Sequence, residues 1–297
     1  MNGGGEPVKV VHMTHSTEQP ADSDWINIGR DLDTGIESVH AHFQGHAYDP
    51  HDHDEVLVGV TLQGVQRFSC HRSLHTSTVG RAMLIEPGAV HDGHAPEPEG
   101  FTYAMLYLPQ PWVTAMTGRL GLGDASALEA AFHSTLADDP PLSAAIYQAF
   151  LAIHQNEGKL ARDQTLDQLL AMLSRHLYRT PPSPRMEHDL VLNRAREYLH
   201  AHMANDVGLD ELAAHSGIDR FRLTRQFKRA FGQTPHAYLV RLRLRAARAL
   251  LARGEAPAEV AAQVGFADQS HLGLWFRRAY RLTPASYQRQ CTNLTDH

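Results

Sequence analysis

The stretch GFADQSHLGLWFRRAYRLTPASYQRQ, Gly265–Gln290, decides the fold of the C-terminal part of this 297-residue chain. It has an earlier counterpart, because residues 257–288 align with residues 209–239 at an offset of 48 and, after one extra residue, of 49. Two segments that hold register over this length predict a repeated structural unit. The alignment pairs Gly217 with Gly265, Phe227 with Phe276, Pro235 with Pro284, and Tyr238 with Tyr287.

Each copy predicts two helices joined by a tight turn, over residues 208–231 in the first unit and 256–280 in the second. A pair of alanines lets the two helices cross closely, and the glycine that follows gives the turn its backbone freedom. Asp219 is a typical N-cap for the second helix of the first unit. That helix is expected to bury Leu223 and Phe227, and its counterpart Leu272 and Phe276. Between the units, Thr234-Pro235 begins a long helix that ends at Gly254.

These residues follow the signature of the AraC/XylS family of bacterial transcription regulators, which the chain resembles over about 100 residues. The resemblance implies two helix-turn-helix units joined by a linker helix, with two recognition helices in neighbouring turns of the DNA major groove. The physical spacing agrees, because grooves on one face of DNA recur every ~34 Å and a rigid helix can hold that separation.

The resemblance also implies which side chains meet DNA. Arg225 is the main candidate for base readout, because a guanidinium can bond guanine O6 and N7 together. Gly273-Leu274 departs from the family pattern, where many relatives carry a polar residue and an arginine, so the second unit is expected to read less sequence. The residues expected at base edges are Arg220, Phe221, Thr224, Arg225, Gln269, Ser270 and His271. Those expected at phosphates, which position a protein without specifying sequence, are Lys228, Arg229, Arg277 and Arg278.

The charge distribution is consistent with a polyanion partner for the C-terminal third. Residues 186–297 carry 16 Lys and Arg against 11 Asp and Glu, whereas the rest of the chain carries 11 against 22. A net of +5 over this third is modest, so ordinary surface scatter is an equal explanation.

The N-terminal region has a different pattern. EVLVGV, GRAMLIEPG and GFTYAMLYLP predict short strands bounded by turns, and several such strands favour an antiparallel sandwich or barrel. Residues 111–179 are helical in pattern, with a leucine stripe from Leu166 to Leu177 that suits packing on its own domain as well as a dimer seam. TPPSP, residues 180–184, indicates a hinge.

The stretch PHDHDEVLVGV, Pro50–Val60, raises the question of a metal site. His51, His53 and Glu55 alternate, so on a strand they would share one face. The region resembles a cupin-type sensor domain, a fold whose sequence pattern has two metal-binding motifs. HDH, residues 51–53, matches the first motif, and GRAMLIEPGAVH, Gly80–His91, partly matches the second, with His91 at the ligand position. Glu55 lies too early for the cupin glutamate. The favoured interpretation is a metal-free pocket in which His51, His53, Glu55 and His91 contact an effector directly. The alternative is a divalent ion such as zinc, with His51, His53 and His91 as its candidate ligands. Strand alternation adds Tyr103 and Met105 to the effector-binding candidates.

The sequence thus predicts an α+β multidomain protein: a cupin-like antiparallel β-barrel that senses an effector (residues 1–110), a helical linker and candidate dimerisation segment (111–184), and an all-α DNA-binding domain with two helix-turn-helix motifs (185–297). The expected function is a ligand-responsive transcription regulator, an activator as the family implies, and not an enzyme. The alternatives are a metal-dependent cupin enzyme fused to a DNA-binding domain and a constitutive DNA-binding protein with a vestigial barrel. Expected partners are double-stranded DNA, a small-molecule effector, RNA polymerase and a second copy of the chain. Without a signal peptide or membrane span, the chain is expected in the cytoplasm.

Overall fold

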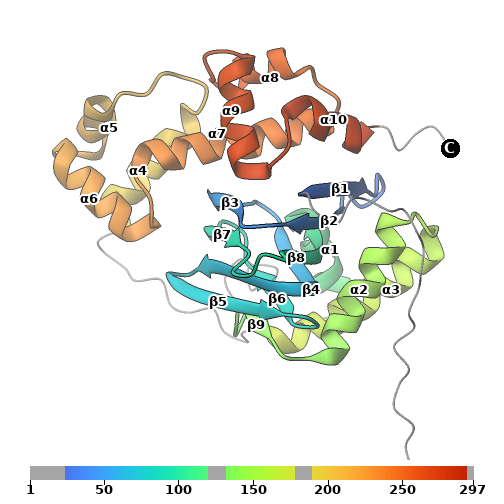
Figure 1. Cartoon of the computed structure of the whole chain (residues 1–297). Coiled ribbons are helices and arrows are strands. Elements are labelled where there is room, and N and C mark those ends of the chain that lie inside the picture. Colours follow the sequence, from blue (N-terminus) through green and yellow to red (C-terminus); the bar gives the residue numbers. More distant parts are fainter. Residues whose placement is uncertain (1–23, 120–131, 178–188, 293–297) are drawn as a thin grey trace, which may run out of the picture.

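The computed structural model of the chain describes residues 24–119, 132–177 and 189–292 (Figure 1). Its N-terminal half is a strongly curved antiparallel sheet that carries helices on its outer face, and its C-terminal part is all helical. The α+β organisation predicted from the sequence is therefore confirmed. The strands are β1 (Trp25–Arg30), β2 (Glu37–Phe43), β3 (His46–His51), β4 (Val56–Cys70), β5 (Ser73–Thr78), β6 (Ala82–Ile85), β7 (His91–His94), β8 (Phe101–Leu108) and β9 (Leu136–Ala137).

The long strand β4 joins two parts of the curved sheet. Its first part pairs with β6 and β8, and its second part pairs with β5 and β7. Inward side chains such as Phe43, Phe68 and Met83 form one buried cluster inside the curved sheet. The predicted strand over residues 50–60 was wrong in one respect: β3 ends at His51 and β4 begins at Val56, so His51, His53 and Glu55 do not share one strand. The intervening residues instead turn the chain, and the carbonyl of His53 accepts a hydrogen bond from Gly88 N.

Two helices cover the outer face of the sheet. These are α2 (Pro140–His154) and α3 (Lys159–Leu173), preceded in the chain by α1 (Gln110–Arg119) and followed by a short 3-10 turn, Ser174–His176. Leu166, Leu169 and Leu173 pack in one buried cluster with α2 and the outward side chains of β4 and β8. The leucine stripe therefore packs on its own domain and does not form an exposed seam for a dimer.

A histidine pair between the sheet and α2 gives a testable pH dependence. Burial, and secondarily His154, lowers the pKa of His40 to about 4, and the ring of His40 packs against Trp25 and Phe150. The folded state binds this proton more weakly than the unfolded chain. The contribution of neutral His40 to the free energy of unfolding is therefore complete above pH 6.5 and is lost as the pH falls towards 4. His40→Phe should match the wild type in thermal unfolding at pH 7.5 and exceed it at pH 5. An unchanged difference between the two pH values would contradict this.

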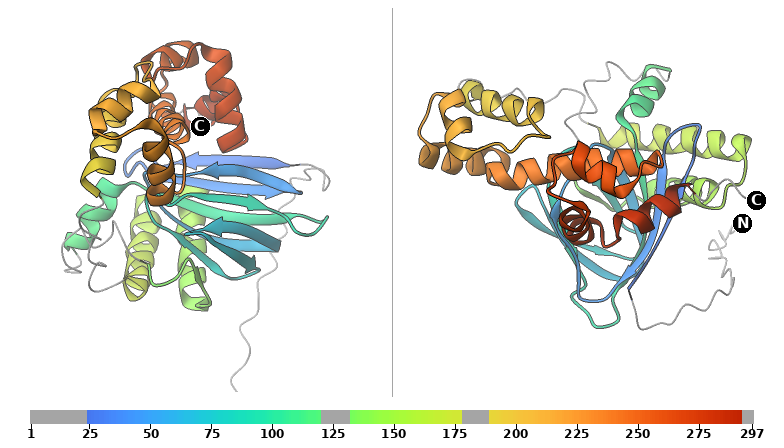
Figure 2. Two further views of the ribbon diagram at one scale, coloured as in Figure 1. Left: turned by 90° about the vertical axis from the view of Figure 1, so that its left-hand side faces the viewer. Right: turned by 90° about the horizontal axis from the view of Figure 1, so that it is seen from above.

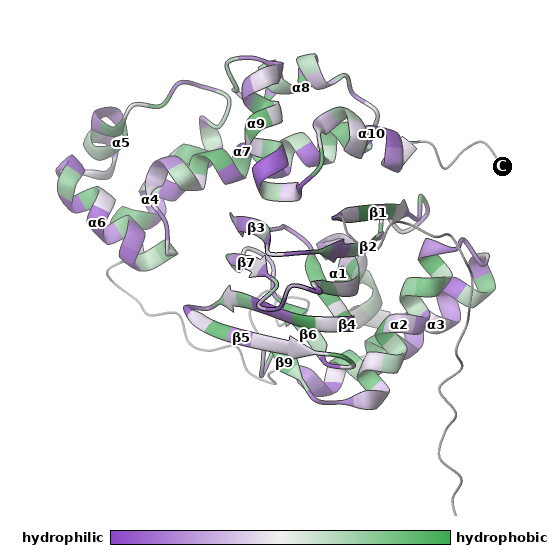
Figure 3. Ribbon diagram, viewed as in Figure 1, coloured by the Kyte–Doolittle hydropathy of each residue, from purple (hydrophilic) through white to green (hydrophobic). Residues whose placement is uncertain are grey.

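The C-terminal helices repeat a pattern, as predicted. They are α4 (Asp189–Ala201), α5 (Leu209–Ser216), α6 (Arg220–Phe231), α7 (Pro235–Ala252), α8 (Pro257–Gln263), α9 (Gln269–Tyr280) and α10 (Pro284–Thr292). Helices α5 and α6 pack on α4, and α8 and α10 pack on α9, so that α7 runs between two groups of helices (Figures 1 and 2). Figure 3 shows hydrophobic and hydrophilic residues alternating around these helices, as amphipathic helices require.

Each group has its own core. Leu223 and Phe227 are fully buried in the first, and Leu272 and Phe276 in the second. The left-handed backbone at Gly217 and Gly265, with φ of +74° and +85°, explains glycine at the turn after α5 and α8. Among the helices that the structure describes, none has the length and apolar character needed to cross a membrane.

Candidate DNA-binding surface and effector pocket

The second helix of each repeat presents polar and basic side chains to solvent. The carboxylate of Asp219 accepts hydrogen bonds from Phe221 N and Arg222 N and so begins α6, and Asp268 accepts one from His271 N and so begins α9. Two large apolar side chains are exposed on these helices, Phe221 at 74% and Leu274 at 57%. The other exposed candidates are Arg220, Arg225, Lys228, Arg229, Gln269, Ser270, His271, Arg277 and Arg278, and Thr224 is half-buried.

Several of these candidates already have partners within the chain. Arg220 lies 3.4 Å from Asp210 and stacks over the Phe221 ring at 4.9 Å. The Thr224 hydroxyl donates to the Arg220 carbonyl. Arg278 is different, because it forms an ion pair with Asp49 of the barrel at 2.9 Å. The Asp49 carboxylate therefore competes with a DNA phosphate for this guanidinium.

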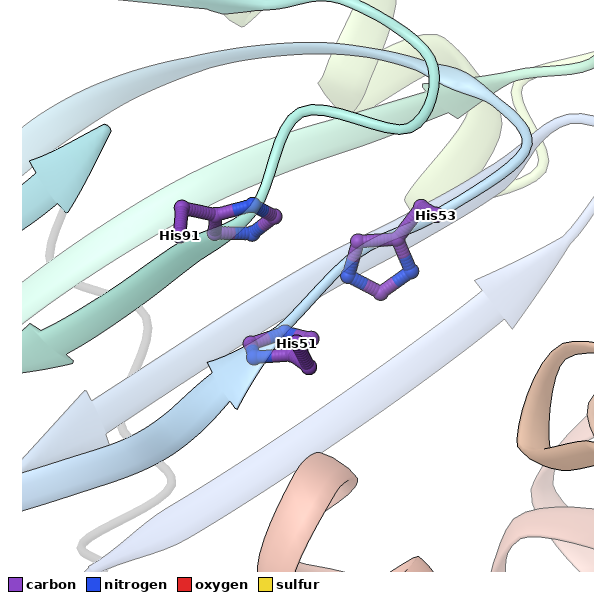
Figure 4. A group of neighbouring side chains, drawn as sticks. All are labelled: His51, His53 and His91. Atoms are coloured by element: carbon purple, nitrogen blue, oxygen red, sulfur yellow. The ribbon is translucent and has the colours of Figure 1, made fainter. Parts of the chain in front are cut away.

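Three histidines form a compact group at the barrel opening, which we call the histidine cluster: His51, His53 and His91 (Figure 4). His51 ends β3 and faces His91, which begins β7, across the ladder. One ring nitrogen from each residue lies within 4.8 Å of the others, and all three side chains are buried. The sequence prediction that these residues come together therefore agrees with the geometry, although Glu55 points elsewhere.

The hydrogen bonds of two cluster members fix their tautomers. His51 Nδ1 lies 2.9 Å from the Asp49 carbonyl, and His91 Nδ1 lies 2.9 Å from the Ala89 carbonyl. Because a carbonyl only accepts, each Nδ1 carries the proton and each Nε2 has a free lone pair. Burial lowers the pKa of His91 to about 4 and that of His51 and His53 well below the usual value. Neutral imidazoles with oriented rings are the form that binds metal ions.

Two members of the cluster, His51 and His53, line a cavity of about 30 Å³ that has walls from both halves of the chain. A volume of this size holds about one water molecule or ion. Tyr103 lines it as expected, whereas Met105 is buried in the barrel core without reaching it. The barrel side is formed by Ile26, Ile28, Val39, Tyr48, His51, His53, Tyr103 and Tyr107, and the helical side by Arg248, Ala279, Tyr280, Leu282 and Tyr287.

The helical side of the cavity belongs to an extensive contact between the domains, which we call the docking interface: α7, α9 and α10 against β1, β2, β3 and the loop before β4. At its centre the buried Glu37 accepts hydrogen bonds from Arg248 and, at 2.7 Å, from the Tyr287 hydroxyl. Arg248 also bonds Glu55 at 3.0 Å and lies over the Tyr107 ring at 4.5 Å. Burial alone would lower the pKa of Arg248, but Glu37 and Glu55 raise it well above its usual value.

Further ion pairs surround this centre, and each joins a C-terminal arginine to an N-terminal acid. Arg245 bonds Asp54 at 3.1 Å and lies 3.7 Å from Asp52. Arg281 bonds Asp24 at 3.1 Å. The excess of basic charge in the C-terminal third is thus partly neutralised inside the chain, which is a third explanation for the asymmetry, besides a polyanion partner and surface scatter.

Sequence reasoning missed these interface residues. Arg241, Arg245 and Arg248 recur at i, i+4 and i+7, so they lie on one face of α7, and this spacing was a signal for a charged contact surface. Helix α7 was expected only to join the two units. The acids that meet the arginines are scattered over residues 24–55, and no local pattern links them to α7.

Comparison with known proteins agrees with both parts of this architecture. The model of the AraC-like ligand-binding domain matches residues 33–170, and that of a helix-turn-helix domain matches residues 212–290. The uncharacterized HTH-type transcriptional regulator YbfI of Bacillus subtilis is 26% identical over 228 residues, which cover 75% of this chain and 80% of that protein. The HTH-type transcriptional activator RhaS of Escherichia coli is 38% identical over 94 residues, which cover 31% of this chain and only 34% of RhaS.

Among solved structures, apo ToxT of Vibrio cholerae superimposes over 89% of this chain and all of its own, with a TM-score of 0.58 at 12% identity. ToxT with a bound unsaturated fatty acid gives a TM-score of 0.56 at 11% identity, over 92% of this chain and 98% of its own. These likenesses concern the fold alone.

A ligand-binding β-domain followed by paired helix-turn-helix units defines a transcription regulator with a sensor domain and a DNA-binding domain. The model of the N-terminal domain is described as AraC-like, and the relatives from Bacillus subtilis and Escherichia coli are named as HTH-type transcriptional regulators. The chain thus joins an AraC-like ligand-binding domain to a helix-turn-helix domain, which are the two parts of an AraC-type regulator.

Proposed function

We propose that this chain is a ligand-responsive activator of transcription that reads two successive major-groove segments with α6 and α9. The duplicated units and their exposed basic side chains support two contacts with one face of DNA. The match to RhaS, whose name describes an activator, supports the sign of regulation. DNase footprinting on the regions beside the gene tests this: protection over two consecutive helical turns is expected, and protection that never exceeds one turn would contradict it.

We propose that the effector acts at the cavity beside the histidine cluster. The observation that carries this is the cavity wall, which is shared by the barrel and by α7, α9 and α10. A ligand shifts an equilibrium only by binding two arrangements with different affinity. In the docked arrangement the cavity has room for about one water molecule, so an effector that needs more space or competes with the docked helices would bind better after they move away.

The same proposal assigns a role to each segment of the chain. Residues 1–110 sense the effector, residues 111–184 couple the parts and carry α2 and α3, and residues 185–297 read DNA. Partners are double-stranded DNA, RNA polymerase and a second copy of the chain, in the cytoplasm. Because the leucine stripe of α3 is buried against the sheet, we propose that any dimer uses another surface.

We propose that the chain regulates and does not catalyse. The histidine cluster is the feature that a metal-dependent cupin enzyme would use, but in the docked arrangement Arg248 contacts His53, and Tyr280 packs against His51 and His53. If variants of the cluster lose the effect of the effector on DNA binding and no small molecule is turned over, sensing is supported. Turnover of a small molecule that requires metal, and that is lost in His51→Ala, would support the enzyme.

Arg225→Ala should weaken binding to a guanine-containing site by ~1–3 kcal/mol, because a bidentate guanidinium contact is lost. Fluorescence anisotropy with operator DNA measures this, and the loss should shrink when the contacted guanine is replaced. Arg67→Ala, which removes an equally exposed arginine from β4, is the matched control and should leave the affinity unchanged. Equal losses in both variants would indicate a general charge effect instead of base readout.

A further inference from the structure

His53 is bonded differently from the other two members of the histidine cluster. Its Nδ1 faces Arg248 Nη1 at 3.5 Å, and its Nε2 is buried with no hydrogen-bond partner among the described residues. A guanidinium only donates, so the nitrogen that faces it must present a lone pair. The proton of neutral His53 therefore sits on Nε2 in the docked arrangement, opposite to the tautomer that the carbonyls impose on His51 and His91.

This bonding brings Arg248 into conflict with a bound metal ion. If His53 held an ion through Nε2, its proton would move to Nδ1 and an N–H would then face the guanidinium. If His53 held the ion through Nδ1, the ion would need the lone pair that Arg248 covers. Either nitrogen leads to the same result, so coordination by His53 and docking of Arg248 oppose each other.

Charge acts in the same direction. A divalent cation at the cluster would lie beside Arg248, whose guanidinium is buried and therefore poorly screened. Arg241 and Arg245 lie on the same face of α7, and their shared partner Asp52 is itself buried. An ion added to this site would raise the free energy of the docked arrangement relative to one in which α7 has moved into solvent.

The donor set indicates the kind of ion. Three imidazoles without a carboxylate suit a divalent transition metal such as Zn²⁺, Co²⁺ or Ni²⁺, whereas Mg²⁺ and Ca²⁺ prefer oxygen ligands. Three protein ligands leave an open position on such an ion.

We propose that His51, His53 and His91 bind a divalent transition-metal ion, and that this ion and the docked Arg248 exclude each other, so that metal binding releases α7 from the barrel. This inference deepens the proposed function and rests on it, because it names the effector class and the residue that transmits its binding. Release would also separate Arg278 from Asp49 and make that arginine available for DNA.

The test is a titration of the metal-free protein with Co²⁺, whose visible spectrum reports imidazole coordination, followed by competition with Zn²⁺. Arg248→Met removes the competing cation, and Glu55→Gln weakens its docking at a half-buried acid with less risk to folding. Because docking lowers the fraction of chains able to bind, both variants should bind Co²⁺ more tightly than the wild type, by about tenfold or more for Arg248→Met. His53→Ala should lose the spectrum, and His94→Ala, which alters a histidine of β7 outside the cluster, should keep it.

A second readout measures release directly. Ile28 N donates to the Gln290 side chain at 3.0 Å across the docking interface, so hydrogen exchange of β1 should accelerate when Zn²⁺ is added to the wild type. Metal binding of equal strength in wild type, Arg248→Met and Glu55→Gln would overturn the exclusion. The absence of any cobalt spectrum in all three would overturn the metal site. Neither outcome affects the footprint over two helical turns, which tests the proposed function separately.

Discussion

Phe227→Ala is expected to destabilise the first helix-turn-helix unit by about 3–5 kcal/mol and to remove its half of the DNA footprint. The ring is fully buried in one cluster with Leu192, Leu199, Leu223 and Leu239, so truncation leaves a cavity in the core of this unit. The second unit has a separate core around Phe276 and should remain folded. Hydrogen exchange resolved by peptide, together with footprinting, measures both effects.

Phe276→Ala makes the same change in the second unit, and the loss of stability and of DNA protection should then be confined to that unit. Phe221→Ala is the control for the chemistry of the change, because this ring is 74% exposed and contributes little to the core. It should leave the unfolding midpoint unchanged and weaken DNA binding only. If Phe227→Ala abolished both halves of the footprint at once, the two units would be one cooperative body and not a pair joined by α7.

Glu37→Ala is expected to weaken the docking interface by about 3–5 kcal/mol. The carboxylate is 5% exposed and joins Arg248, Arg30 and the Tyr287 hydroxyl, so its removal leaves buried donors without their acceptor. Losing one partner of a buried ion pair costs this much because the other charge stays desolvated. Hydrogen exchange of β1 should accelerate strongly, and DNA affinity should rise as Arg278 is released from Asp49.

Two controls separate this effect from a general change of charge. Glu99→Ala removes an equal charge from an exposed position of the barrel and should not alter β1 exchange. A double-mutant cycle with Arg248→Met should show coupling, because the two residues are in contact. Unchanged protection of β1 in Glu37→Ala would mean that the apolar contacts around Ile28 hold the domains together on their own.

Local patterns were enough to predict the repeated unit, since they depend on neighbours in the chain. The N-cap Asp219, the turn glycines and the buried Phe227 and Phe276 all follow from spacing within some 30 residues. The same reasoning failed for residues 52–55, where alternation of His51, His53 and Glu55 suggested one strand. Alternation fixes a common face only while the backbone stays extended, and here the chain turns between β3 and β4.

The sequence by itself therefore determined the class of fold, the twin helix-turn-helix units and the meeting of His51 with His91 through two recognisable boxes. Only the tertiary structure decided that Arg248 covers His53 and that Glu37, more than two hundred residues away, holds it there. The physical reason is that caps, turns and amphipathic periods are short-range properties. An ion pair between distant elements depends on how two folded domains pack together, and the local sequence of either element does not indicate which residue it will meet.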